Sequence, residues 1–80
     1  MTEAECLARL TPVFREVFRD EAIVVRPEMT AQDVARWDSL SHIDMIVAVE
    51  EAFGVRIPTR EVTRMKNVGD LVRIILAQAK

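Results

Sequence analysis

Apolar residues recur every three or four positions along three separate stretches of this eighty-residue chain. In the first stretch Leu7, Leu10 and Phe14 share one face of a helix, because an α-helix repeats about every 3.6 residues. This spacing predicts a helix from about Glu3 to Arg19. A chain of this length supports one modest core, so we expect a single domain over residues 1–80.

Two features interrupt the helical pattern before residue 38. Pro12 lies inside the first helix, where it removes a backbone donor, and predicts either a kink or a fresh helix start capped by Thr11. Residues 20–37 have no sustained period and are expected to form a long connection over the core, with one short helical turn at residues 30–33. The apolar residues expected to pin this connection are Ile23, Val25, Val34 and Trp37.

Three more helices are expected after the connection. One begins at Asp38 or Ser39 and ends at Gly54, a residue that accepts the left-handed backbone of a helix C-terminus. A short one follows Pro58 through about residue 65, with Val62 and Met65 turned inward. Residues 67–70 resemble the cap of a last helix. The fold class is therefore an all-α four-helix bundle with three longer helices and a short third one. The last helix has the apolar stripe Val68, Leu71, Val72, Ile75 and Ala79.

Composition excludes several classes of protein. A net charge of −2 gives no field that would attract a nucleic-acid backbone. No apolar stretch approaches the roughly 18 residues of a membrane span, and the acidic N-terminus does not resemble a secretion signal. One cysteine and one histidine leave no zinc set. We expect a cytoplasmic monomer, free-standing because its ends lack linker-like flanks.

The helix expected from residue 38 to residue 54 has two apolar faces. Ile46, Val49 and Phe53 cluster on the side expected to face the core. A second apolar strip lies on another side among carboxylates, an arrangement typical of a docking surface for basic partners, although a helix central to the bundle would also have two apolar faces. The strip is formed by Leu40, Ile43 and Val47, and the carboxylates are Asp44, Glu50 and Glu51.

Ser39 stands where that helix begins. Unpaired N–H groups and a partial positive charge at a helix N-terminus favour an anionic phosphate ester there. Asp38 offers a carboxylate to a cationic modifying enzyme, and Leu40 offers an apolar contact. The alternative is that Asp38 or Ser39 is only a helix cap, and three residues alone are a weak motif.

The stretch from Trp37 to Pro58 resembles the phosphopantetheine-dependent acyl carrier proteins and the related peptidyl carriers. The resemblance rests on Asp-Ser-Leu at residues 38–40, Glu-Glu-Ala-Phe-Gly at residues 50–54 and Ile-Pro at residues 57–58. It implies a non-enzymatic carrier in which Ser39 receives 4'-phosphopantetheine from coenzyme A through a phosphopantetheinyl transferase. The arm's thiol would hold acyl or aminoacyl groups, delivered by a loading ligase or transferase to downstream synthase enzymes. The implied docking residues are Leu40, Ile43, Val47 and Ile57, with the acidic Asp38, Asp44, Glu50 and Glu51.

The chain departs from carriers of fatty acid synthesis, which are strongly acidic along the second and third helices. Arg56, Arg60 and Arg64 populate the short third helix and its approach, which argues against generic partners of fatty acid synthesis. The lead into Asp-Ser-Leu is Ala-Arg-Trp at residues 35–37 instead of the Gly-rich lead of fatty acid and peptidyl carriers, and in this it is more similar to discrete carriers of specialised bacterial pathways. Acyl and aminoacyl cargo both stay open, as does an unmodified helical interaction module. Hydrolysis by Ser39 and His42 is disfavoured, because no orienting acid or oxyanion hole is indicated; His42 could instead border a cargo cavity.

Overall fold

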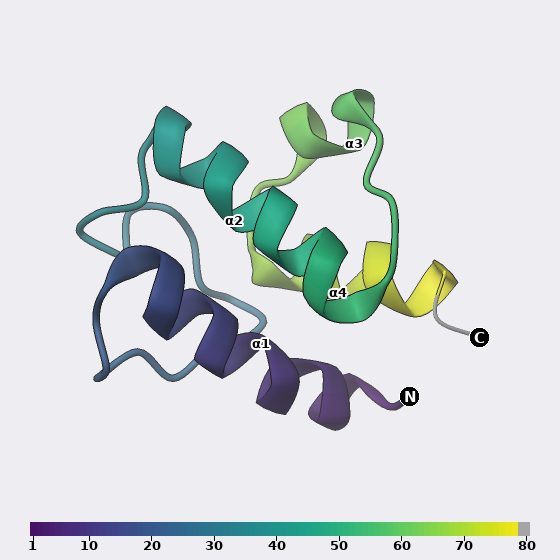
Figure 1. Cartoon of the computed structure of the whole chain (residues 1–80), viewed down its shortest axis with the longest axis horizontal. Coiled ribbons are helices and arrows are strands. Elements are labelled where there is room, and N and C mark those ends of the chain that lie inside the picture. Colours follow the sequence, from purple (N-terminus) through teal and green to yellow (C-terminus); the bar gives the residue numbers. More distant parts are fainter. Residues whose placement is uncertain (79–80) are drawn as a thin grey trace.

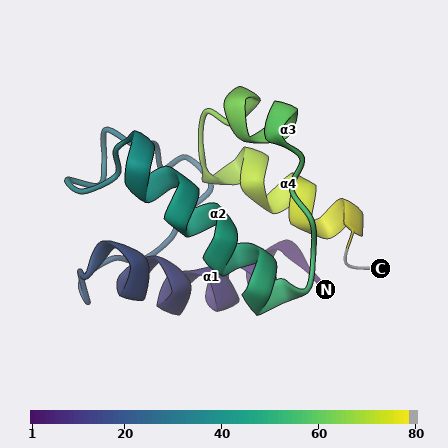
Figure 2. The same cartoon turned by 45° about the horizontal axis from the view of Figure 1, so that its top comes forward.

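The computed structural model describes residues 1–78, and within them the chain forms four helices and no strand. These helices are α1 (Glu3–Phe18), α2 (Ser39–Phe53), the short α3 (Thr59–Arg64) and α4 (Val68–Gln78). Helix α1 packs against both α2 and α4. In Figures 1 and 2, α3 lies on the side of α2 that faces away from α1. This confirms the predicted all-helical bundle with a short third helix.

Helix α1 continues without a break across Pro12. Thr11 does not cap a new helix there, so that alternative prediction was wrong. Its hydroxyl donates to the carbonyl of Leu7 at 3.1 Å and accepts the backbone N–H of Val25 at 3.3 Å. The threonine therefore ties the long connection to α1, an arrangement that local sequence rules do not contain.

The ends of α2 lie where the sequence places them. Asp38 is the N-cap in an extended conformation, and Ser39 is the first helical residue. At the other end Gly54 adopts a left-handed φ of 65° and donates its N–H to the carbonyl of Glu50 at 2.9 Å. A glycine takes this conformation without the steric cost that other residues bear.

The connection of residues 20–37 runs from the end of α1 to the start of α2 (Figure 1). It is pinned, as predicted, by buried apolar side chains. Residues 30–33 form a single turn, as predicted, with the Asp33 N–H donating to the Thr30 carbonyl at 2.9 Å. One turn closed by one hydrogen bond is too short to propagate, since helix nucleation is costly. The buried side chains are Ile23, Val25, Met29, Val34 and Trp37, of which Met29 was not predicted.

The connection also supplies part of the cap of α4. The N–H groups of Val68 and Gly69 donate to the carbonyls of Met29 and Pro27 at 2.9 and 2.8 Å. Gly69 permits this close approach, because a Cβ there would lie only 3.2 Å from the Pro27 oxygen. The Asn67 side chain accepts the N–H three residues later at 3.0 Å, as its predicted capping role requires. Loop and helix are thus joined through their backbones.

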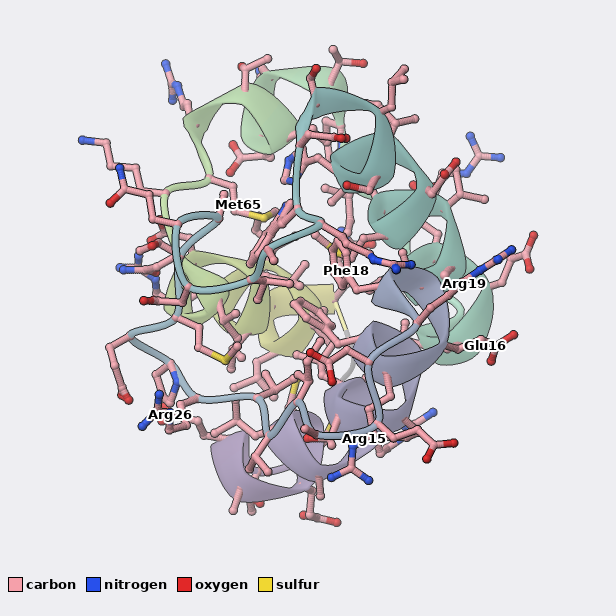
Figure 3. The ribbon with its side chains drawn as sticks, turned by 90° about the vertical axis from the view of Figure 1, so that its left-hand side faces the viewer. Arg15, Glu16, Phe18, Arg19, Arg26 and Met65 are labelled. Atoms are coloured by element: carbon pink, nitrogen blue, oxygen red, sulfur yellow. The ribbon has the colours of Figure 1, made fainter. Side chains whose placement is uncertain are left out.

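One apolar core collects side chains from the connection and all helices except α3, which contributes no fully buried residue. Val62 of α3 and the following Met65 are half-buried against this core, as predicted. Figure 3 shows Phe18 directed toward the centre and Arg15 and Arg26 lying outside. No helix among the described residues is long and apolar enough to cross a membrane. In α4 the predicted stripe is buried at Val68, Leu71, Val72 and Ile75, and Ala79 lies outside the described residues.

Candidate functional site

The first turn of α2 is organised by the carboxylate of Asp38. Its Oδ1 atom accepts the N–H groups of Leu40 at 3.0 Å and of Ser41 at 2.9 Å. Hydrogen bonds to the charged form stabilise it, so these bonds, chiefly those from Ser41, hold the pKa of Asp38 below its ordinary value. Asp38 is therefore the cap of α2, and this leaves the neighbouring hydroxyl of Ser39 uncommitted.

The two serines of this turn differ in what their hydroxyls do. The Ser41 hydroxyl lies 2.5 Å from the carbonyl oxygen of Arg36 and accepts the Asp38 N–H at 2.8 Å. Ser39 is exposed, and its hydroxyl forms no hydrogen bond within residues 1–78. Only Ser39 therefore presents a hydroxyl that is free to react without first breaking the structure of the turn.

The surroundings of Ser39 suit an anionic ester. It is the first residue of a helix of 15 residues, whose N-terminus has a partial positive charge. The first turn contains no acidic residue. Asp38 is the nearest carboxylate along the chain, and its Oδ1 is engaged in capping. A phosphodiester at Ser39 would thus meet favourable backbone charge, which fits the phosphopantetheine arm that the resemblance implies.

Trp37 and His42 form an aromatic pair next to the first turn of α2. The indole Nε1–H of Trp37 donates to Nδ1 of His42 at 2.9 Å, and the two rings are stacked at an interplanar angle of 21°. His42 Nε2 lies 3.4 Å from the carbonyl oxygen of Val62 in α3. An Nδ1 that accepts from Trp37 leaves Nε2 as the protonated nitrogen, which can donate to Val62. His42 therefore links the connection, α2 and α3.

Beside Ser39 an open recess of about 540 Å³ lies between α2 and α3. His42 lines this recess, as expected from the interpretation that it borders a cavity. The wall is mainly apolar and aromatic, with polar groups from the segment that follows α3. The residues that line it include Trp37, Ser39, His42, Ile43, Val62 and Met65.

The predicted second apolar strip of α2 is present on the surface. Leu40, Ile43 and Val47 are 80%, 54% and 47% exposed, although each is a large apolar residue. Asp44 and Glu51, also exposed, lie on the same helix. The structure thus brings the apolar strip and these two carboxylates together on one outer face of α2.

Two of the expected docking residues have different surroundings. Ile57 is only 6% exposed and belongs to the core, so the expectation that its side chain contacts partners needs correction. Burial of an isoleucine side chain releases about 1.5–3 kcal/mol, which explains why it turns inward beside α2. Glu50 is half-buried, and its carboxylate accepts the Ile57 N–H at 2.8 Å. Its first role is to hold the loop after α2.

Sequence reasoning missed the hydrogen bonds that select between the two serines. The sequence signal for the hydrogen bond from Ser41 to Arg36 was weak, because any serine three residues after an N-cap can form a hydrogen bond to the preceding backbone. The bond between Trp37 and His42 was also missed. Both residues had been noted separately, but five residues of separation across a helix start does not by itself indicate contact.

A helical bundle with a free serine at the start of its second helix is the architecture of a small carrier domain with a covalent arm. Comparison with known proteins agrees. A family model described as the phosphopantetheine attachment site matches residues 8–75. An acyl carrier protein of Acidothermus cellulolyticus is 41% identical over 75 residues, which cover 94% of this chain and 89% of that protein.

Two further relatives extend this result. The meromycolate extension acyl carrier protein of Mycolicibacterium smegmatis is 35% identical over 74 residues, covering 92% of this chain and 75% of that protein. The solution structure of a holo acyl carrier protein from Geobacter metallireducens is similar with a TM-score of 0.85 and 42% identity, over 90% of this chain and 83% of that one. The chain belongs to the family of phosphopantetheine-bearing acyl carrier proteins, and its prosthetic group is 4'-phosphopantetheine.

Proposed function

We propose that Ser39 carries the 4'-phosphopantetheine arm and that the whole chain works as one carrier domain for acyl groups. The observation that supports this is the contrast between the free hydroxyl of Ser39 and the engaged hydroxyl of Ser41. When attached, the arm supplies a thiol that holds an acyl group as a thioester. Asp38 and Leu40 flank the hydroxyl and would contact the phosphopantetheinyl transferase that installs the arm.

The carrier itself supplies no catalytic base in this proposal. His42 follows Ser39 by three residues, but its Nδ1 already accepts the Trp37 N–H. Asp38 Oδ1 accepts the N–H groups of Leu40 and Ser41. We therefore infer that the transferase, rather than the carrier, removes the proton of the Ser39 hydroxyl, in keeping with a non-enzymatic role for this chain. The expected monomeric state and cytoplasmic location stay predictions.

The relatives favour acyl over aminoacyl cargo, because the matched proteins are named acyl carrier proteins, and one is named for meromycolate extension. We therefore place the chain in fatty acid, polyketide or related lipid biosynthesis. Its further partners would be an enzyme that loads the acyl group and synthase enzymes that act on it. Leu40, Ile43 and Val47 would dock into these partners, with Asp44 and Glu51 alongside, and Glu50 would contribute mainly through the loop it holds.

The test is modification of the purified chain by coenzyme A and a broad-specificity phosphopantetheinyl transferase. Intact mass should increase by one arm for the wild-type chain and for Ser41→Gly. It should not change for Ser39→Ala, which removes the reacting oxygen. Circular dichroism of both variants controls for folding. An arm on Ser39→Ala, or its loss on a folded Ser41→Gly chain, would refute the assignment of Ser39.

A further inference from the structure

Helix α3 is tied to α2 by one side chain. Within residues 1–78 the only hydrogen bond that joins these two helices runs from His42 Nε2 to the carbonyl oxygen of Val62, at 3.4 Å. Helix α3 has no side-chain cap and no fully buried residue. The recess of about 540 Å³ beside Ser39 lies between the same two helices. A change in the bond from His42 therefore changes how α3 borders the recess.

The hydrogen bonds of His42 require a neutral ring. An indole N–H can only donate, so Nδ1 of His42 must be unprotonated to accept from Trp37 at 2.9 Å. The neutral ring then has its one N–H at Nε2, where it faces Val62. A second hydrogen, on Nδ1, would point at the indole hydrogen across the same short distance. A protonated His42 therefore has to leave the indole, and the geometry that directs Nε2 at α3 is lost with it.

We propose that His42 is a proton-operated latch, whose neutral ring holds α3 against α2 and whose protonation releases α3 and opens the recess. The imidazole moves rather than the indole, because Trp37 is 9% exposed and packs against the rings of Phe14 and Phe18. His42 is half-buried at the edge of the open recess, so water can deliver the proton. The latch would regulate access to the site beside Ser39, and that role alone rests on the proposed function.

The charged groups around His42 are few and do not replace the lost bond. Two of them line the recess with it, Asp38 at the start of α2 and Lys66 after α3. The Oδ1 atom of Asp38 already accepts two backbone N–H groups of the first turn, and the ammonium group of Lys66 disfavours a second positive charge nearby. The residues of the connection and of α3 that line the recess are uncharged. Protonation therefore weakens the contact between α2 and α3 without creating a new ion pair.

The chain suits a direct test, because it contains one tryptophan and one histidine. Nuclear magnetic resonance of the unmodified chain between about pH 7.5 and about pH 5.5 follows the ring signals of His42, the indole N–H signal of Trp37 and amide exchange in α3. An imidazole in water takes up its proton below about pH 6.5, so the three should change together. Protection of residues 61–64 relative to residues 71–75, corrected for the intrinsic exchange rate, should fall by about tenfold, since only the released state binds the proton.

Two variants separate the latch from a general effect of acid. His42→Gln keeps an acceptor and a donor that cannot titrate, so the protection ratio should lose its dependence on pH. Trp37→Phe keeps an aromatic ring without the N–H that opposes the proton, and it should also remove most of the response. Circular dichroism controls for folding of both variants.

The inference is overturned if His42 titrates in the wild-type chain while the protection ratio stays constant, because the protonated ring then keeps its place. The same fall of the ratio in His42→Gln would overturn it as well. The arm does not enter this experiment. Its failure to attach in the mass experiment would refute the carrier proposal and leave the latch intact, whereas a constant protection ratio leaves the assignment of Ser39 untouched.

Discussion

The recess beside Ser39 is bordered by α2, by α3 and by Ala31 and Trp37 of the connection, and the connection and α3 are built differently. The connection of residues 20–37 buries five apolar side chains and bonds through its backbone to both α1 and α4. On the other side α3 has six residues, no fully buried side chain and no side-chain cap. Ser39, the proposed attachment site, therefore lies between a firmly held segment and a loosely held one. The well-anchored connection holds Ser39 in its exposed position, whereas α3 can move when cargo or a partner binds.

The largest expected effect is a loss of stability when the buried tryptophan of the connection is removed. Trp37 is 9% exposed, packs against the rings of Phe14 and Phe18, and donates to His42. Trp37→Ala should lower the free energy of unfolding by about 3–5 kcal/mol, since it leaves a large cavity. Urea denaturation followed by circular dichroism measures it. Val24→Ala, an exposed position on the same connection, should cost under about 0.5 kcal/mol. Similar costs for the two variants would show that the connection is not anchored by its indole.

A smaller effect should appear in the native state, as a difference in amide hydrogen exchange rate between α3 and α4. Amide hydrogen exchange in residues 61–64 should be at least about a hundredfold faster than in residues 71–75, because α3 opens locally without disturbing the core. Hydrogen exchange monitored by nuclear magnetic resonance at neutral pH measures this ratio. Equal protection of the two helices would mean that α3 opens only with the whole domain, and the contrast between α3 and the connection would disappear.

The smallest expected effect is the acid sensitivity of the turn where the connection meets α2. Hydrogen bonds hold the pKa of Asp38 low in the folded chain, so its ionised carboxylate stabilises the fold at any pH above the ordinary carboxyl pKa. This contribution is lost as the pH falls through the lowered pKa. Asp38→Asn keeps a capping side chain but cannot titrate. The wild-type chain should exceed this variant in Tm above about pH 4, and the advantage should vanish on further acidification.

Thermal denaturation between about pH 6 and pH 2 compares the two chains. Glu5, whose pKa is also lowered by hydrogen bonds from Thr2, titrates in both chains and therefore cancels in the comparison. A difference in Tm that does not change with pH would show that the Asp38 charge contributes nothing at this turn.

Local sequence signals predicted most of the fold because their physical causes are local. The repeat of apolar residues located the helices, and Asp38 and Gly54 marked the ends of α2, since capping depends on neighbours within a few residues. The exposure of Leu40, Ile43 and Val47 followed from helical periodicity, which separates them from Ile46 and Val49. Ser39 could be singled out because its position at a helix start gives it the favourable end of the helix dipole.

Only the tertiary structure decided which of these side chains are available. The family resemblance implied that Ile57 is a docking residue, yet its side chain is buried in the core, and Glu50 accepts its backbone N–H. Contacts between distant segments also join Thr11 to Val25 and His42 to Val62. Such pairings depend on how the helices pack, because residues far apart in the chain have no fixed separation until the core forms.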